Sequence, residues 1–168
     1  MPAPDAAQRE AARQLELLKE MRLVEEAILA RAPEHDLQPS LDRIAAVMDL
    51  LGEPQRTFPA IHVTGTNGKT STARIIERIL REMGLKTGRF TSPHLHDIRE
   101  RISIGGEMIS REDFLDAYRD VAPFVEAVDA RSLDEGGPRM TYFEVVVAVA
   151  YAAFAAAPVD VAIVEVGM

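Results

Sequence analysis

A short segment with two glycines, residues 64–71, carries the residue types that bind a phosphate group. Gly65 and Gly68 let the backbone curl, so that successive N–H groups can converge on one anion. Lys69 adds a positive charge that can reach the β- and γ-phosphates of a nucleotide, and the Thr70 hydroxyl can meet Mg²⁺ or a phosphate oxygen. The segment therefore predicts a phosphate-binding loop.

This loop departs from the strict pattern G-x-x-x-x-G-K-[ST], because Val63 stands where the first glycine would be. The alternative interpretation is an Asn67-Gly68 turn followed by a helix. The surrounding sequence favours phosphate binding, because an apolar run predicts a strand at residues 60–64 and an apolar period predicts a helix at 69–83. The positive end of the helix dipole would then face the anion.

A carboxylate is expected close to this loop. Glu165 lies at the carboxyl end of residues 159–166, an otherwise apolar run in which only Asp160 is also charged, as in a strand covered on both faces. Burying a carboxylate there is costly unless it meets a cation. Mg²⁺ held between Glu165 and nucleotide phosphates would resolve that cost. The alternative is a glutamate that faces solvent or an arginine.

The elements that must position these residues alternate along the chain. Helical periodicity covers residues 6–31, 40–52, 69–83, 110–130 and 141–157, and strands are expected at 60–64, 86–91, 101–104 and 159–166. This alternation predicts an α/β fold with a P-loop-type, doubly wound, mostly parallel sheet flanked by helices. Ser40 is expected to cap the second helix, residues 131–139 to form a flexible loop, and Ile75, Ile76, Ile79 and Leu80 to be core positions.

Composition excludes several classes of protein. The 168 residues include 19 Lys and Arg against 27 Asp and Glu, and this acidic balance argues against a general nucleic-acid binder. The absence of cysteine removes disulfides, thiolate catalysis and cysteine-bound zinc. There is no run of 18 apolar residues, so no membrane span is expected. These features predict a cytoplasmic protein.

Several segments occur together in a characteristic order. They are Thr-Gly-Thr-Asn-Gly-Lys-Thr-Ser at 64–71, Thr-Ser-Pro-His-Leu at 91–95, Glu-Arg-Ile at 100–102, Thr-Tyr-Phe-Glu at 141–144 and Val-Glu-Val-Gly at 164–167. From about Asp36 onward the chain resembles the N-terminal part of the folylpolyglutamate synthase/dihydrofolate synthase branch of the Mur ligase family. Many members read Gly-Lys-Gly-Ser in the loop, whereas this chain has Gly-Lys-Thr-Ser.

The resemblance implies a fold and a reaction. The fold would be that of the Mur ligase central domain, incomplete at the C-terminus, with residues 1–35 as an N-terminal helix, residues 36–168 as the ATP-binding domain, and the glutamate ligase domain absent. The reaction would join L-glutamate to dihydropteroate or to the γ-carboxylate of a folate, with ATP as co-substrate, Mg²⁺ as cofactor and an acyl phosphate as intermediate.

The resemblance also implies roles for individual residues. Lys69 would be catalytic, Ser92 and Glu165 would hold Mg²⁺, and the pteroate or folate would meet Thr141, Asp36, Leu37 and His94. The ATP-binding residues would be Gly65, Thr66, Asn67, Gly68, Lys69, Thr70 and Ser71.

Each of these roles has an alternative drawn from the residues alone. Ser92 before Pro93 can simply begin a loop, and Thr141 with Glu144 fits a capping box at the start of a helix. His94 and His96 form an H-x-H pair that could hold a metal, but two histidines alone are weak support. Arg99 and Arg101 could contact an anionic substrate or pair with nearby acids.

Three functions are consistent with the sequence. The first is the folate ligase, expected to be monomeric, with small-molecule substrates and neither nucleic acid nor membrane as partner. The others are a Mur-type ligase that adds an amino acid to a peptidoglycan precursor, and a nucleotide-binding module without catalysis. The 168 residues alone are expected to show no ligase turnover.

Overall fold

The computed structural model describes residues 5–33 and 40–167. They contain a sheet of order β1-β5-β2-β3-β4, formed by β1 (Ala60–Val63), β2 (Thr87–Phe90), β3 (Ile102–Ile104), β4 (Glu107–Met108) and β5 (Val161–Glu165). β1, β5 and β2 run parallel, and the short strands β3 and β4 extend the β2 edge as antiparallel neighbours. The predicted α/β fold with a largely parallel sheet is confirmed.

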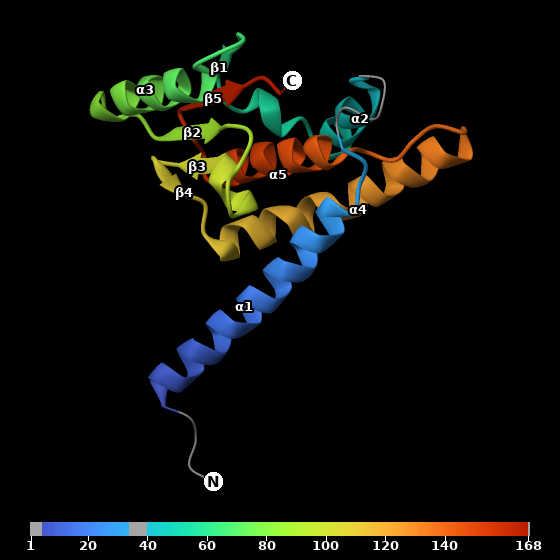
Figure 1. Ribbon diagram of the computed structural model, residues 1–168, viewed down its shortest axis with the longest axis horizontal. Helices are drawn as coiled ribbons and strands as arrows, with labels where there is room; N and C mark the ends of the chain where they lie inside the picture. The colour runs from blue at the N-terminus through green and yellow to red at the C-terminus, as the bar shows by residue number, and fades with distance from the viewer. Residues whose placement is uncertain (1–4, 34–39, 168) are drawn as a thin grey trace.

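The helices cover both faces of the sheet. They are α1 (Ala6–Leu29), α2 (Asp42–Leu50), α3 (Lys69–Glu82), α4 (Arg111–Asp134) and α5 (Tyr142–Ala156), with short 3-10 turns η2 (Pro54–Arg56) and η3 (Ile98–Arg101). α3 lies on one side of the sheet and α5 on the other, with α4 beyond it and the first turns of α1 extending away from the body (Figure 1). Within the described ranges, every helix is too short or too polar to cross a membrane.

The face of the sheet toward α5 carries the main hydrophobic core. Phe154 of α5 is fully buried and meets the ring of Phe58 edge-on at 5.9 Å between centroids. Gly88 of β2 lies directly beneath Phe154, since a Cβ atom at residue 88 would come within 2.7 Å of that ring. Phe90, two residues along the same strand, meets Phe143 edge-on. Aromatic rings therefore join α5 to the sheet.

The face toward α3 has a much smaller apolar cluster. Ala73, Val63 and Ile163 are buried there, and Ile76 and Leu80 pack partly against them. The expectation that Ile75 and Ile79 are core positions is wrong, because their side chains are 61% and 55% exposed. The buried face of α3 follows the helical spacing 73, 76, 77 and 80, so it includes the acidic residue Glu77 in place of those two isoleucines.

Two further expectations about helix ends change. α4 continues to Asp134, so residues 131–134 are helical, and the Ser132 hydroxyl donates to the Pro138 carbonyl across the remaining turn at 2.6 Å. α2 is capped at Leu41, although the Ser40 hydroxyl still accepts the Asp42 N–H at 3.0 Å. Local hydrogen bonds extend one helix and shift the other by a residue.

The topology brings three loops to one edge of the sheet. β1, β5 and β2 point the same way, with Val63 opposite Glu165 and Phe90 opposite Val164. The connection from β1 to β2 crosses the face that carries α3, whereas α4 and α5 precede β5 and α5 covers the opposite face. In such sheets, ligands bind outside the carboxyl ends of the strands, at the point where the connections from two neighbouring strands run to opposite faces of the sheet. The loop after β1, Ser92 after β2 and Glu165 at the end of β5 all lie there.

Candidate functional site

The loop between β1 and α3 has the backbone of an anion site. Gly65 has φ +140° and Gly68 has φ +75°, conformations that side chains with a Cβ rarely adopt. Gly68 is the N-cap of α3, and within the described residues no side chain caps the helix and no acid stands in its first turn. The first N–H groups of this helix of 14 residues therefore have no side-chain cap among the described residues, which leaves them available to an anion.

The side chains that follow are directed toward the same edge. The Lys69 ammonium donates to the Gly65 carbonyl at 2.7 Å, so it lies folded over the loop. The Thr70 hydroxyl donates to Glu165 Oε2 at 2.8 Å. Thr66, Asn67 and Ser71 are exposed. The side chain of Lys69 thus contacts the loop, and that of Thr70 contacts Glu165.

Glu165 is a buried carboxylate, only 3% exposed. Besides Thr70, its Oε2 accepts the backbone N–H of Ser92 at 3.4 Å. In residues 5–33 and 40–167, Glu165 forms no ion pair with an arginine, lysine or histidine. The alternative that Glu165 faces solvent or an arginine is wrong, because the strand end places it inside the site beside two neutral donors.

A cavity of about 730 Å³ opens next to these groups. Lys69, Ser92 and Glu165, three of the predicted site residues, line it. Its other lining residues are Leu29, Arg31, Pro33, Pro93, Arg101, Tyr142, Phe143 and Val166. The predicted contacts Asp36 and Leu37 fall outside the described residues. Thr141 and His94 do not line the cavity but lie next to residues that do.

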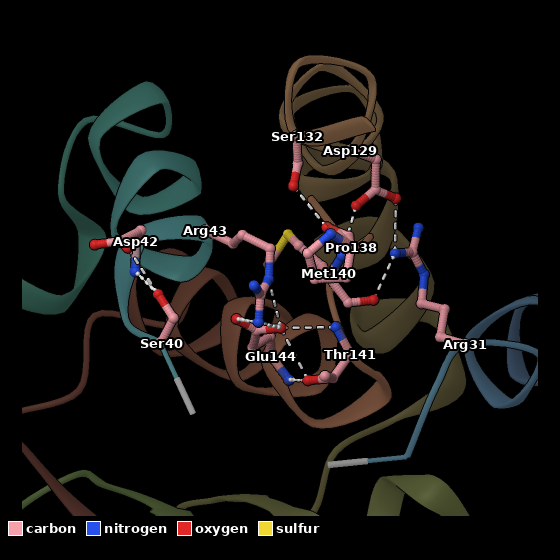
Figure 2. A network of polar contacts seen from close by, with 10 residues as sticks. All are labelled: Arg31, Ser40, Asp42, Arg43, Asp129, Ser132, Pro138, Met140, Thr141 and Glu144. Atoms are coloured by element: carbon pink, nitrogen blue, oxygen red, sulfur yellow. Dashed lines mark hydrogen bonds and ion pairs between the residues drawn. The ribbon is translucent and has the colours of Figure 1, made fainter. Parts of the chain in front are cut away.

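Thr141 caps α5 in the way the capping-box interpretation predicts. Its hydroxyl accepts the Glu144 N–H at 3.2 Å, and Glu144 Oε2 accepts the Thr141 N–H at 2.7 Å. The carboxylate of Glu144 also pairs with Arg43 of α2 at 3.1 Å, and both side chains are 11% exposed (Figure 2). The hydroxyl of Thr141 is therefore engaged within the fold, and the two residues after it form the cavity wall.

A partly buried ion pair joins the residues after α1 to the same segment. Arg31 pairs with Asp129 of α4 at 2.8 Å and donates to the Met140 carbonyl at 3.1 Å, while Asp129 accepts the Met140 N–H at 2.7 Å (Figure 2). The Ala32 carbonyl accepts the Tyr142 N–H at 3.1 Å. These contacts place the first turn of α5 beside α1, so that Tyr142 and Phe143 line the cavity.

Arg101 is the cavity residue that the sequence left undecided. It is 7% exposed, its guanidinium lies 5.0 Å from the centre of the Tyr142 ring, and its Nε donates to His94 Nδ1 at 2.9 Å. Arg99 instead pairs with Asp97 at 2.6 Å. Of the two roles that the sequence left open, Arg101 lines the cavity, and Arg99 forms an ion pair with a nearby acid.

The surroundings of His94 disfavour the protonated form of its ring. Burial and the positive charge of Arg101 lower the pKa of His94 below its usual value of 6.5. Its Nδ1 accepts the hydrogen bond from Arg101 and lies 3.3 Å from the Tyr142 hydroxyl. That nitrogen is therefore engaged within the fold. Among the described residues, no group of three or more histidine, aspartate or glutamate side chains is placed to hold a metal ion, so the structure gives the H-x-H metal hypothesis no support there.

Comparison with known proteins shows which family this chain is similar to. The sequence pattern of the family described as Mur ligase middle domain matches residues 63–107, which run from the end of β1 through the loop to β4. A Mycobacterium tuberculosis protein named dihydrofolate synthase/folylpolyglutamate synthase is 52% identical over 148 residues, covering 86% of this chain and 30% of that protein. The chain thus spans about a third of the length of such relatives.

Solved structures agree with the sequence comparison. Mycobacterium tuberculosis folylpolyglutamate synthase complexed with ADP superposes with a TM-score of 0.85 at 48% identity, covering 90% of this chain and 33% of that one. A folylpolyglutamate synthase complex with AMPPCP and folate gives a TM-score of 0.75 at 35% identity, covering 88% and 35%. Over most of its length the chain is therefore similar to folylpolyglutamate synthases/dihydrofolate synthases, and part of it matches the middle domain of the Mur ligase family.

Proposed function

We propose that the protein containing this chain is an ATP-dependent ligase that joins L-glutamate to dihydropteroate, to the γ-carboxylate of a folate, or to both. The observation that carries the proposal is that Lys69, which directly follows the glycine loop, lines one cavity together with Ser92 and the buried carboxylate of Glu165. Related proteins of this branch bind ADP, and one complex holds both AMPPCP and folate.

The loop residues would hold and orient the triphosphate. The N–H groups at the start of α3 offer hydrogen bonds to phosphate oxygens, and Lys69 would exchange its contact with the Gly65 carbonyl for the β- and γ-phosphates. The substrate carboxylate would attack the γ-phosphorus of ATP, and ADP would leave, which gives an acyl phosphate. The glutamate amine would then attack the acyl carbon and lose a proton, and inorganic phosphate would leave as the amide forms. Holding two anions in line is the main task of these residues.

The donor set suits Mg²⁺. Glu165 is a buried carboxylate with only neutral hydrogen-bond donors around it in the described residues, and Ser92 lies next to it. Mg²⁺ prefers such oxygen ligands together with phosphates. We propose that Glu165 and Ser92 hold the ion, which would neutralise charge on the transferred phosphoryl group.

The other end of the cavity would take the pteroate or folate. Tyr142 and Phe143 offer aromatic surface, and Arg101 offers a guanidinium that has no carboxylate partner among the described residues. Thr141 and His94 would act from behind this wall, by capping α5 and by holding Arg101. Substrate carboxylate and ATP would thus enter one cavity from opposite sides.

The proposal includes the organisation of the protein. Residues 1–35 would be an N-terminal helix on an ATP-binding domain of residues 36–168, and glutamate would be bound by a further domain of the longer protein. We propose a monomeric cytoplasmic enzyme that acts on small molecules, without nucleic acid or membrane as partner. The isolated 168 residues are proposed to be inactive.

A substrate panel on the full-length protein tests the reaction. Dihydropteroate, tetrahydrofolate and a UDP-muramyl peptide would each be supplied with ATP, Mg²⁺ and L-glutamate, and ADP release would be measured. We expect turnover with one or both pteridines and none with the muramyl peptide. Lys69→Ala should abolish ADP release, whereas Arg78→Ala, an exposed cation on the same helix, should not. Full activity of Lys69→Ala would rule out the assigned role of the loop.

Glu165→Gln tests the metal assignment. The variant keeps the shape of the side chain but loses its charge, so the Mg²⁺ concentration needed for half-maximal ADP release should rise about tenfold or more. Glu82→Gln, which lies exposed at the far end of α3, serves as the control. An unchanged Mg²⁺ requirement in Glu165→Gln would assign this carboxylate a structural role.

A further inference from the structure

A buried polar cluster lies on the α3 face of the sheet, and none of its residues lines the cavity. Its members are Glu77 of α3, Arg89 of β2, Thr91 after β2 and Ser103 of β3, and none is more than 8% exposed. Charged side chains are rarely buried to this degree unless they are paired. The hydrogen-bond partners of these four side chains show which elements the cluster connects.

The cluster is a directed chain of hydrogen bonds. Arg89 Nε donates to Glu77 Oε2 at 2.6 Å, and another nitrogen of the same guanidinium donates to the Thr91 hydroxyl at 3.1 Å. Ser103 donates its hydroxyl hydrogen to Glu77 Oε1 at 3.0 Å. Arg89 therefore bridges α3 to the segment that follows β2, whereas Ser103 bonds only to the far oxygen of Glu77.

This series of hydrogen bonds continues into the candidate site. Thr91 is followed by Ser92, whose N–H lies 3.4 Å from Glu165 Oε2, and the same oxygen accepts the Thr70 hydroxyl. Thr70 and Glu77 are both on α3, so the contacts form a closed circuit from the start of the helix through Glu165, Ser92, Thr91 and Arg89 back to it. The Thr91 N–H also donates to the Arg101 carbonyl at 2.9 Å.

We propose that Arg89 is a positioning residue for the nucleotide site, acting through the Thr91 hydroxyl to fix Ser92 against Glu165. The inference rests on the proposed function, because it concerns the Mg²⁺–nucleotide site assigned there. A planar guanidinium with several donors can hold a carboxylate and a hydroxyl at once, and a single ammonium or an apolar side chain cannot reproduce that geometry.

The contrasting explanation is that the cluster only stabilises the fold. The two hydroxyls of the cluster distinguish these explanations, since each makes one hydrogen bond to the Arg89–Glu77 pair and each is at most 3% exposed. Only Thr91 lies between Arg89 and Ser92. Removing either hydroxyl should cost similar stability, but removing the Thr91 hydroxyl alone should disturb the site.

The experiment compares Thr91→Val with Ser103→Ala in the full-length protein. Affinity for AMPPCP would be measured by titration calorimetry at several Mg²⁺ concentrations, and Tm would be measured without nucleotide. Thr91→Val should weaken Mg²⁺–AMPPCP binding about three- to tenfold, the factor associated with one hydrogen bond. Ser103→Ala should bind as the wild type does at a comparable loss of Tm, and Thr91→Ser should recover the affinity because it restores the hydroxyl.

The outcomes separate this inference from the proposed function. Equal affinities for Thr91→Val and Ser103→Ala, at either the wild-type or a weakened level, would overturn the positioning role of Arg89 while leaving the nucleotide site intact. Failure of Thr91→Ser to recover affinity would also overturn it. Absence of Mg²⁺–AMPPCP binding in the wild type, or unchanged binding in Lys69→Ala, would instead reject the proposed function, and the inference would fall with it.

Discussion

The two faces of the sheet stabilise the same strands by different means. β2 shows this within four residues: Gly88 and Phe90 point to α5 and meet aromatic rings, whereas Arg89 points to α3 and meets a carboxylate. The α5 face excludes water with interchangeable apolar contacts, which have little directionality. The α3 face uses hydrogen bonds that hold only at defined distances and angles.

The difference corresponds to what each face must do. The α5 face holds the helices together and forms the far wall of the cavity through Phe143. The α3 face carries the loop. In the function proposed above, α3 would present its first N–H groups to an anion, and this requires the helix to be fixed in both position and rotation. A buried ion pair is weak support for stability but well suited to geometry. We expect the two faces to respond differently to substitution.

The largest expected effect is on the α5 face. Phe154→Ala removes a fully buried ring and should lower the free energy of unfolding by about 3–5 kcal/mol, because the space above Gly88 cannot close. Ile79→Ala, on the exposed side of α3, should change it by less than about 0.5 kcal/mol. Urea unfolding measures both. Similar losses for the two variants would contradict the assignment of the main core.

A smaller effect with a distinctive rescue is expected on the α3 face. Arg89→Met leaves Glu77 buried without its cation and should cost about 3 kcal/mol, the lower end of the usual range because Ser103 still donates to that carboxylate. The double variant Glu77→Leu/Arg89→Met should recover most of this loss, since an apolar pair needs no partner. Urea unfolding of the singles and the double forms the cycle. Additive losses would mean that the pair is not coupled.

The smallest expected effect concerns His94 and acid. Its pKa is lowered in the folded chain by burial and by Arg101, so below pH 6.5 the unfolded chain takes up a proton that the folded chain resists. Stability therefore falls as the pH drops from 6.5 through the lowered pKa, and the loss is constant once both states are protonated. His94→Gln should remove this contribution. The difference between the Tm-versus-pH profiles of the wild type and the variant cancels the contributions of the other histidines, which both proteins share. Parallel profiles would contradict the lowered pKa.

The parts of the site that were predictable from sequence are local. Gly65, Gly68 and Lys69 lie within five consecutive residues between a strand and a helix, and their chemistry follows from that order. The capping box of Thr141 and Glu144 also depends on spacing alone, and it is present. Glu165 could be placed at a strand end because β5 is a continuous apolar run, although only the fold shows that it meets Thr70.

The unpredicted parts depend on distant partners. Glu77 was indistinguishable from a surface acid on α3 until β2 placed Arg89 2.6 Å away, and Ile75 and Ile79 looked like core until that face proved to be exposed. Arg31 and Asp129 are 98 residues apart, yet they help to position Tyr142 on the cavity wall. No periodicity relates such pairs.

The sequence alone predicted a phosphate-binding loop, the alternation of helices and strands, and the resemblance to one branch of a ligase family, because each can be recognised in short segments whose residues are near one another in the chain. The tertiary structure decided that β5 lies between β1 and β2, and that order brings Lys69, Ser92 and Glu165 to one cavity. It also decided which buried charges are paired. Strand order and charge pairing are properties of three-dimensional packing, in which the free energy of burial depends on neighbours that the chain brings together only on folding.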